Sequence, residues 1–174
     1  MDPITKDSDV SATTVNSQVS STLPTLNTVN LTSGADIVTP QANAAEEINA
    51  ALGGTSPSLG RTDQIDGGSA QDTINVAMDG NFLLGFSSGF MKDVEIVNLA
   101  ATASSVTPKT FNFTGVSGVE TINVGAANAQ VIVSNISDTG LTLNLSGQST
   151  GAFDVGFATG TISGSGSALT VGLT

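Results

Sequence analysis

The chain has 174 residues, of which 15 are Asp or Glu and only 4 are Lys or Arg, so its formal net charge at pH 7 is −11. This negative charge would repel a nucleic-acid backbone or an anionic membrane surface, and no segment has the run of about eighteen apolar residues that a membrane-spanning helix needs. Cys and His are both absent, which excludes disulfides, thiolate nucleophiles, imidazole bases and histidine-containing metal sites.

The first part of the chain, residues 1–26, is polar, rich in Ser and Thr and without apolar periodicity, which is typical of a flexible linker. The remainder, residues 27–174, is long enough for one domain with a continuous core. The sequence ends within an apparent strand. We therefore expect residues 27–174 to be one module of a longer protein.

A short motif, apolar residue then Asn then apolar residue, recurs along this module. It lies within residues 28–31, 73–76, 96–99, 121–124 and 142–145, and from Asn75 onward the asparagines are 23, 25 and 21 residues apart. Alternation points the aliphatic side chains to one face and the Asn to the other, and 20 to 25 residues suit one turn of a solenoid. The motif predicts stacked parallel strands. A ladder of side-chain amides or a plain polar surface is favoured over a sugar-binding role for these asparagines.

One segment predicts a helix. Residues 41–52 are rich in Ala and include Glu46 and Glu47, and Gly53-Gly54 follows as a stop signal. Strands separated by Gly-rich and Ser-rich turns occupy the rest of the module. The expected fold is therefore all-β: a parallel β-helix or β-solenoid-like domain with one short helix and calcium-binding turns.

The acidic turn at residues 62–76 is the most distinctive segment. Asp63, Asp66 and Asp72 flank a Gly-Gly pair within ten residues, and no basic residue follows them until Lys92. Carboxylates this close repel one another, and Ca²⁺ prefers carboxylate and main-chain carbonyl oxygens. The segment predicts a calcium-binding turn. The alternative is a set of solvated turn residues, because Asp is common in turns.

Three further acidic residues are candidate calcium ligands. Asp36 follows residues 33–35, Ser-Gly-Ala, and precedes a β-branched strand in the same layout as the acidic turn. Glu95 and Glu120 begin two of the repeated strands, so stacking would place their carboxylates about one strand spacing, ~4.8 Å, apart. Such a pair needs a cation or an exposed position, and a solvated sheet face is the alternative.

The acidic turn also resembles a known calcium-binding repeat, G-G-x-G-x-D-x-U-x, in which U is apolar. Gly67, Gly68, Asp72 and Ile74 match this template, while Ala70 stands in place of its third glycine. The glycines of the template let main-chain carbonyls converge on an ion. Because Ala tolerates positive φ poorly, this turn is expected to depart from the ideal shape or to lack one ligand.

Beyond this turn, the order of segments is similar to that of bacterial S-layer proteins with RTX-type calcium repeats. Residues 31–39 resemble the L-T-x-G-x-D-x-h-T segment of that family, residues 63–76 resemble its D-x-I-D-G-G-x-G-x-D-T-L-N-V segment, and residues 94–99 and 119–124 resemble its N-V-E-T-I-N-V strands. The resemblance covers about residues 28–145. With the acidic turn, it gives these candidate calcium ligands: Asp36, Asp63, Asp66, Gly68, Asp72, Glu95 and Glu120.

The resemblance implies a structural, calcium-binding module of a secreted, self-assembling S-layer protein on the bacterial cell surface. Calcium would drive folding and lattice assembly, and another part of the parent protein would contact cell-surface polysaccharide. Neither nucleic acid nor membrane insertion is expected. The alternative is an RTX-type adhesin or toxin module that displays a host-binding or glycan-binding face. Enzymatic activity is not expected, because carboxylate pairs such as Asp66 with Asp72 lack an aromatic sugar platform.

Overall fold

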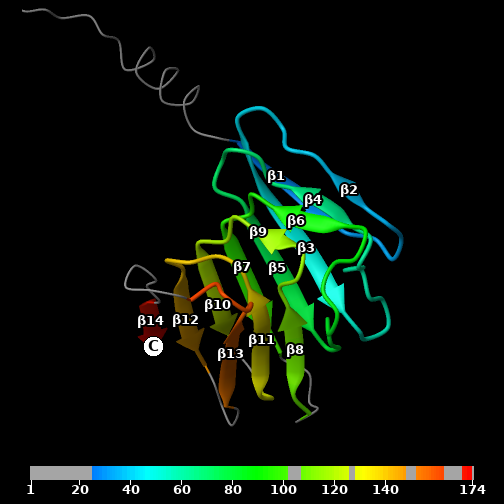
Figure 1. Ribbon diagram of the computed structural model, residues 1–174. Coiled ribbons are helices and arrows are strands. Elements are labelled where there is room, and N and C mark those ends of the chain that lie inside the picture. The colour runs from blue at the N-terminus through cyan, green and yellow to red at the C-terminus, as the bar shows by residue number, and fades with distance from the viewer. Residues whose placement is uncertain (1–24, 102–106, 126–127, 148–151, 163–169, 174) are drawn as a thin grey trace, which may run out of the picture.

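The computed structural model describes residues 25–101, 107–125, 128–147, 152–162 and 170–173. These residues form an all-β, parallel β-solenoid of about 5 turns, and they contain no helix. The strands belong to three parallel sheets (Figure 1). Among the described residues, none forms a helix of the length and apolarity required to cross a bilayer.

Sheet A, of seven strands, extends through the whole molecule. Its strands, in order across the sheet, are β1 (Thr25–Asn30), β3 (Ala44–Leu52), β5 (Thr73–Met78), β7 (Ile96–Ala100), β10 (Thr121–Gly125), β12 (Thr142–Ser146) and β14 (Thr170–Leu173). Figure 1 shows this sheet running from β1 in blue to β14 in red. Each turn of the solenoid therefore adds one strand to the same wall.

The second wall of the solenoid changes along the chain. In the first turns it is sheet B, with strands β2 (Ile37–Val38), β4 (Gln64–Asp66), β6 (Phe90–Lys92) and β9 (Val116–Ser117). Sheet C has strands β8 (Lys109–Asn112), β11 (Val131–Ile136) and β13 (Phe153–Phe157); it begins in the turn that also contains β9, and it continues in the later turns. Figure 1 shows sheet B beside the first strands of sheet A and sheet C beside the last ones.

The core consists of aliphatic side chains stacked turn upon turn beneath sheet A. Ile74 pairs in register with Val97, Val97 with Ile122, and Ile122 with Leu143. All four side chains are buried, and each such burial contributes about 1.5–3 kcal/mol. The predicted inward face of the repeated motif is therefore confirmed.

Phenylalanines fill the interior where sheet B gives way to sheet C. The ring centroids of Phe82 and Phe86 are 5.1 Å apart, those of Phe82 and Phe111 5.3 Å, and those of Phe111 and Phe113 4.9 Å. All four side chains are buried, and aromatic pairs at these distances add to the stabilisation from burial.

The helix predicted at residues 41–52 is wrong, because most of this segment forms strand β3. Its residues alternate between buried and half-buried with a period of two, and it pairs with both β1 and β5. The local helix propensity of Ala and Glu is overridden by hydrogen bonding to a strand on each side. Ile48-Asn49-Ala50 supplies a further copy of the apolar-Asn-apolar motif.

The repeated asparagines form a continuous ladder of side-chain hydrogen bonds on the outer face of sheet A, which we term the amide ladder. Each Nδ2 donates to the Oδ1 of the preceding turn: Asn49 to Asn30 at 3.1 Å, Asn75 to Asn49 at 3.2 Å, Asn98 to Asn75 at 2.8 Å, Asn123 to Asn98 at 2.7 Å and Asn144 to Asn123 at 2.8 Å. Of the two roles expected for these asparagines, a ladder or a plain surface, the structure shows the ladder.

Strand β1 begins at Thr25, two residues inside the segment predicted as a linker, residues 1–26. The rest of that segment lies outside the described residues. The boundary between a linker and the module stays a prediction.

Candidate functional site

Four carboxylates stack on consecutive turns at the N-terminal side of sheet A, and we term them the acidic column. In register, Glu47 pairs with Thr73, Thr73 with Ile96, and Ile96 with Thr121. The residues one position earlier therefore lie above one another, and these are Glu46, Asp72, Glu95 and Glu120. The predicted stacking of the last two is confirmed, since the main-chain N–H of Glu120 donates to the carbonyl of Glu95 at 2.9 Å.

The acidic column is most buried at its first two members. Glu46 is 1% exposed and Asp72 is 0% exposed, whereas Glu95 is half-buried and Glu120 is exposed. Buried carboxylates require partners, because removing a charge from water costs several kcal/mol unless it is neutralised or hydrogen-bonded. The demand for hydrogen-bond donors or a neutralising cation is therefore concentrated at Glu46 and Asp72.

Main-chain N–H groups satisfy part of this demand. Glu46 Oε1 accepts from the N–H of Gln41 at 2.9 Å, Asp72 Oδ1 accepts from the N–H of Glu46 at 2.5 Å, and Glu95 Oε2 accepts from the N–H of Asp72 at 2.7 Å. Hydrogen bonds to carboxylates are about twice as strong as those between neutral groups. The column thus ties the β3, β5 and β7 turns together.

Two oxygens of the column remain without a partner. Glu46 Oε2 and Asp72 Oδ2 are buried, and neither has a hydrogen-bond donor. Burial raises the pKa of Asp72 to about 7; the N–H of Glu46 opposes this shift, while the Glu46 side chain and the Glu95 charge reinforce it. Two carboxylates in such surroundings hold either a shared proton or a cation between them.

Gly67 packs closely against the unpartnered oxygen of Asp72, where a larger residue would not fit. A Cβ atom at position 67 would lie 2.7 Å from Asp72 Oδ2 and would overlap the carbonyl oxygen of Asp93. A carboxylate oxygen and a main-chain carbonyl oxygen thus both lie against Gly67, and these are the ligand types that calcium prefers. No three acidic side chains of the described residues form a metal site by themselves, so a cation here would also need main-chain or water oxygens.

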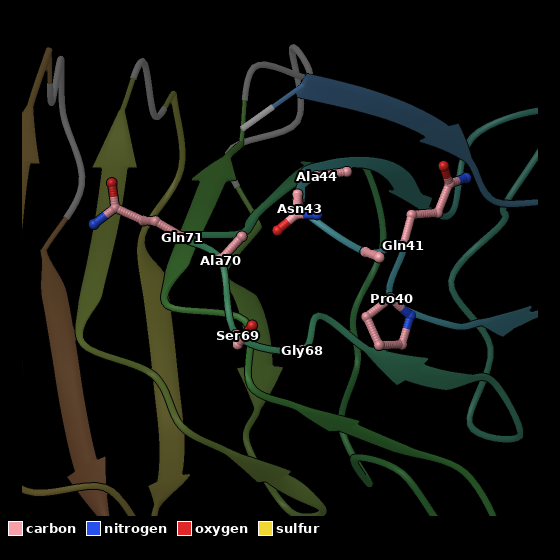
Figure 2. A pocket seen from close by; sticks show the side chains of 9 residues that line it. Pro40, Gln41, Asn43, Ala44, Gly68, Ser69, Ala70 and Gln71 are labelled. Carbon is pink, nitrogen blue, oxygen red and sulfur yellow. The ribbon is translucent and has the colours of Figure 1, made fainter. Parts of the chain in front are cut away.

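A cavity of about 590 Å³ lies between the loops that precede β3 and β5 (Figure 2). Its lining consists of residues 40–44 and 68–71, which include no acidic or basic side chain. Gly68 has a φ of 95°, and a Cβ at this position would lie 2.5 Å from the Cβ of Pro40. In Figure 2 the side chains of Gln41 and Gln71 extend away from this space on opposite sides. Gly68, a predicted calcium ligand, therefore allows two neighbouring loops to pack closely.

Asp36 and Asp63, both predicted ligands, hold loops through hydrogen bonds. Asp63 is buried, and its two oxygens accept from the N–H of Gly60 at 2.7 Å and from the N–H of Asp36 at 3.0 Å. Asp36 accepts from the N–H of Thr32 at 2.8 Å and from its hydroxyl at 2.9 Å. Every carboxylate oxygen of these two residues has a donor.

Asp66 pairs with a lysine on the next strand of sheet B. Asp66 in β4 is in register with Lys92 in β6, and the distance from Lys92 Nζ to Asp66 Oδ2 is 2.6 Å. The same ammonium lies 3.4 Å from Asp93. The expectation that no basic side chain balances the acidic turn is therefore wrong for Asp66.

The structure groups Asp72, Glu95 and Glu120 in one column and places the other predicted carboxylates elsewhere. The sequence interpretation missed Glu46, which lay in the segment predicted as a helix. A signal for it was present: in each turn of the column the acidic residue stands three positions before the Asn of the amide ladder, as Glu46 does before Asn49.

Comparisons with protein-family models, with curated proteins and with solved structures found no match to this chain. Its function is therefore inferred from the solenoid, the acidic column and the motifs of its own sequence.

Proposed function

We propose that this chain is a structural, calcium-binding module of a secreted, self-assembling bacterial surface layer. The observation that carries the proposal is the acidic column, in which two buried carboxylate oxygens, Glu46 Oε2 and Asp72 Oδ2, have no partner. Stacked carboxylates repel one another at the spacing of parallel strands, about 4.8 Å. A cation that neutralises them would stabilise the folded chain.

Calcium is the cation that this chemistry favours. Carboxylates and main-chain carbonyls are hard oxygen donors, and the chain contains no Cys or His to attract softer metals. Magnesium is smaller and demands octahedral geometry with several waters retained, whereas calcium accepts 6 to 8 oxygens in flexible arrangements. A site assembled from two turns of a solenoid suits the larger ion.

Calcium-dependent folding would couple export to assembly. Where calcium is scarce inside the cell, the repelling carboxylates keep the chain loosely folded. Millimolar calcium outside the cell then neutralises these carboxylates, and the turns fold. Extracellular calcium modules commonly have Kd values of about 10⁻⁴ to 10⁻³ M, so one site adds roughly 0.4–1.4 kcal/mol at millimolar calcium. The folded modules then associate into a lattice, and the parent protein binds cell-surface polysaccharide through another part.

The environments of the carboxylates support a structural role over a catalytic one. Asp66 is paired with Lys92, and Asp72 is fully buried behind its own loop. A general acid or base must reach a proton on its substrate. In the pair considered for glycoside hydrolysis, Asp66 is therefore held by Lys92, and Asp72 is buried out of reach of a substrate.

The test is thermal unfolding followed by circular dichroism, in millimolar calcium, in millimolar magnesium and in excess chelator. We expect the melting temperature to fall by several degrees in chelator, since about 1 kcal/mol corresponds to about 2–4 °C for a domain of this size. Magnesium should restore little of the loss. Light scattering on the same samples should show larger particles with calcium. Identical melting curves in calcium and chelator would contradict the proposal.

A further inference from the structure

We infer that the calcium ion binds between the β3 and β5 turns, at Glu46 Oε2 and Asp72 Oδ2 beside Gly67, and not at Asp63 and Asp66 in the first part of the acidic turn. This inference rests on the proposed calcium function and gives it a location. The location includes a ligand, Glu46, that neither the repeat template nor the resemblance suggests.

The first reason is the state of the oxygens themselves. Among the buried side-chain oxygens and nitrogens of the described residues, Glu46 Oε2 and Asp72 Oδ2 are the ones without a hydrogen-bond partner. The other oxygen of each carboxylate accepts a main-chain N–H, at 2.9 Å and 2.5 Å respectively. These bonds fix both side chains, so a cation would meet ligands that are already oriented.

The second reason is the supply of further oxygens around the pair. The carbonyl oxygen of Asp93 and Asp72 Oδ2 both lie against Gly67. Glu95 reaches the N–H of Asp72 with one carboxylate oxygen, at 2.7 Å, and is only half-buried. Two carboxylates, a main-chain carbonyl and several waters match the coordination that calcium takes in proteins.

The third reason is that the competing carboxylates are already satisfied. Both oxygens of Asp63 accept main-chain N–H groups, at 2.7 Å and 3.0 Å. Asp66 has an ammonium at 2.6 Å, which calcium would have to displace. Asp72 is the predicted ligand that has a buried oxygen without a partner, and Glu46 in the neighbouring turn has the second such oxygen.

The experiment is a calorimetric titration of the full chain with calcium chloride, made on the parent and on four variants. Glu46→Gln and Asp72→Asn remove one charge each from the pair. Glu47→Gln is the matched control for the first, because it makes the same change on the adjacent residue of β3, whose side chain accepts the amide of Asn75 at 3.1 Å. Asp66→Asn tests the alternative site, at Asp63 and Asp66 in the first part of the acidic turn.

We expect Glu46→Gln and Asp72→Asn each to weaken calcium affinity at least tenfold, and Glu47→Gln and Asp66→Asn to change it less than threefold. Melting curves in chelator separate loss of a ligand from loss of folding. Without calcium, Glu46→Gln should be at least as stable as the parent, because its amide can donate to Asp72 Oδ2 and the repulsion is gone. A pair that held a shared proton and no calcium would give the same stability in this variant, but the parent would then bind no calcium in the titration.

Each other outcome is decisive. If the parent binds calcium and Glu46→Gln and Asp72→Asn bind it equally well, the location is wrong and the proposed function stands. If Asp66→Asn alone loses affinity, the site lies at Asp66 in the first part of the acidic turn and the inference is overturned. If the parent itself binds no calcium, both the location and the proposed function fail. Should Asp72→Asn not fold, Glu46→Gln alone still decides between these results.

Discussion

The amide ladder and the acidic column are built by the same stacking of sheet A, three residues apart along each strand, yet they differ in chemistry. Every asparagine carries both a donor and an acceptor, so each Nδ2 finds the Oδ1 of the preceding turn at 2.7–3.2 Å. An ionised carboxylate can only accept. Repetition of a self-complementary group stabilises a solenoid, whereas repetition of a carboxylate creates a demand for donors from elsewhere.

The same comparison holds along the chain. Glu46, Asp72 and Glu95 take N–H donors from the main chain and still leave two buried oxygens unpartnered. After Glu120 the column ends, because Leu141 occupies the next position and is buried. The amide ladder continues one turn further, to Asn144. The dependence on a cation is therefore expected in the β3 to β10 turns only.

The largest expected effect comes from placing an amide on the wrong face of sheet A. Ile122→Asn removes a fully buried aliphatic side chain and buries an amide away from the ladder, at an expected cost of about 3–5 kcal/mol. Asn123→Ser, one residue later, exchanges ladder hydrogen bonds for water and should cost about 1 kcal/mol. Urea denaturation would measure both. If the serine variant were the less stable, the assignment of the two faces would be reversed.

The next effect concerns the pH dependence of the calcium-free protein. Because the pKa of Asp72 is raised to about 7 from 3.8, the folded state binds a proton that the unfolded state has lost between about pH 4 and pH 7. Stability in chelator should therefore fall as the pH rises through this window, by on the order of 2–4 kcal/mol, and level off above it. Glu46 and Glu95 face this group, and their charges contribute to its raised pKa.

Chemical denaturation at a series of pH values would measure this trend, with the same series in saturating calcium as the control. In calcium the fall toward pH 7 should be abolished, because the cation replaces the proton. A stability in chelator that rises between pH 4 and pH 7 would show that Asp72 is ionised in the folded protein.

A third variant converts one step of the amide ladder into a step of the acidic column. In Asn98→Asp the new carboxylate can still accept from Asn123 but cannot donate to Asn75, so two oxygens face each other. We expect a loss of about 1–2 kcal/mol at pH 7. Most of it should be recovered below about pH 4, where the protonated acid can donate again. Thermal melts at the two pH values would measure the difference, and an equal loss at both would contradict the comparison.

The smallest expected effect is that of Glu120→Gln. This carboxylate is the exposed end of the acidic column, where water screens its repulsion with Glu95, so the change should alter stability by no more than about 0.5 kcal/mol. A melting curve in chelator, compared with that of Glu46→Gln, would show whether burial sets the strength of repulsion in the column. Equal stabilisation by both variants would contradict that view.

The sequence predicted the sheet better than it predicted the site. The apolar-Asn-apolar motif placed the strands and the ladder because its period is local and repeats. The strand at Ile48 was mistaken for a helix, since its Ala and Glu neighbours favour a helix locally and only pairing with strands from other turns decides otherwise. Asp72, Glu95 and Glu120 were found from the repeat template and from spacing, and Glu46 was lost with its strand.

The partners of the other carboxylates depend on register, which spacing alone does not give. Lys92 lies 26 residues after Asp66 and becomes its neighbour only when β4 and β6 align. The hydrogen bond from the N–H of Asp36 to Asp63 likewise joins two loops from successive turns. Such contacts depend on the number of residues in each loop between two strands of sheet A, and this number varies along the chain.

The amide ladder also has a direction. All of its side-chain dipoles point the same way along the solenoid, with the amino group toward β1 and the oxygen of Asn144 at the far end, where Gly172 contributes no side chain. Turning a single amide around would set oxygen against oxygen on one side and amino group against amino group on the other. The asparagines are thus fixed in orientation as a group, and the outer face of sheet A is polarised from one end of the solenoid to the other.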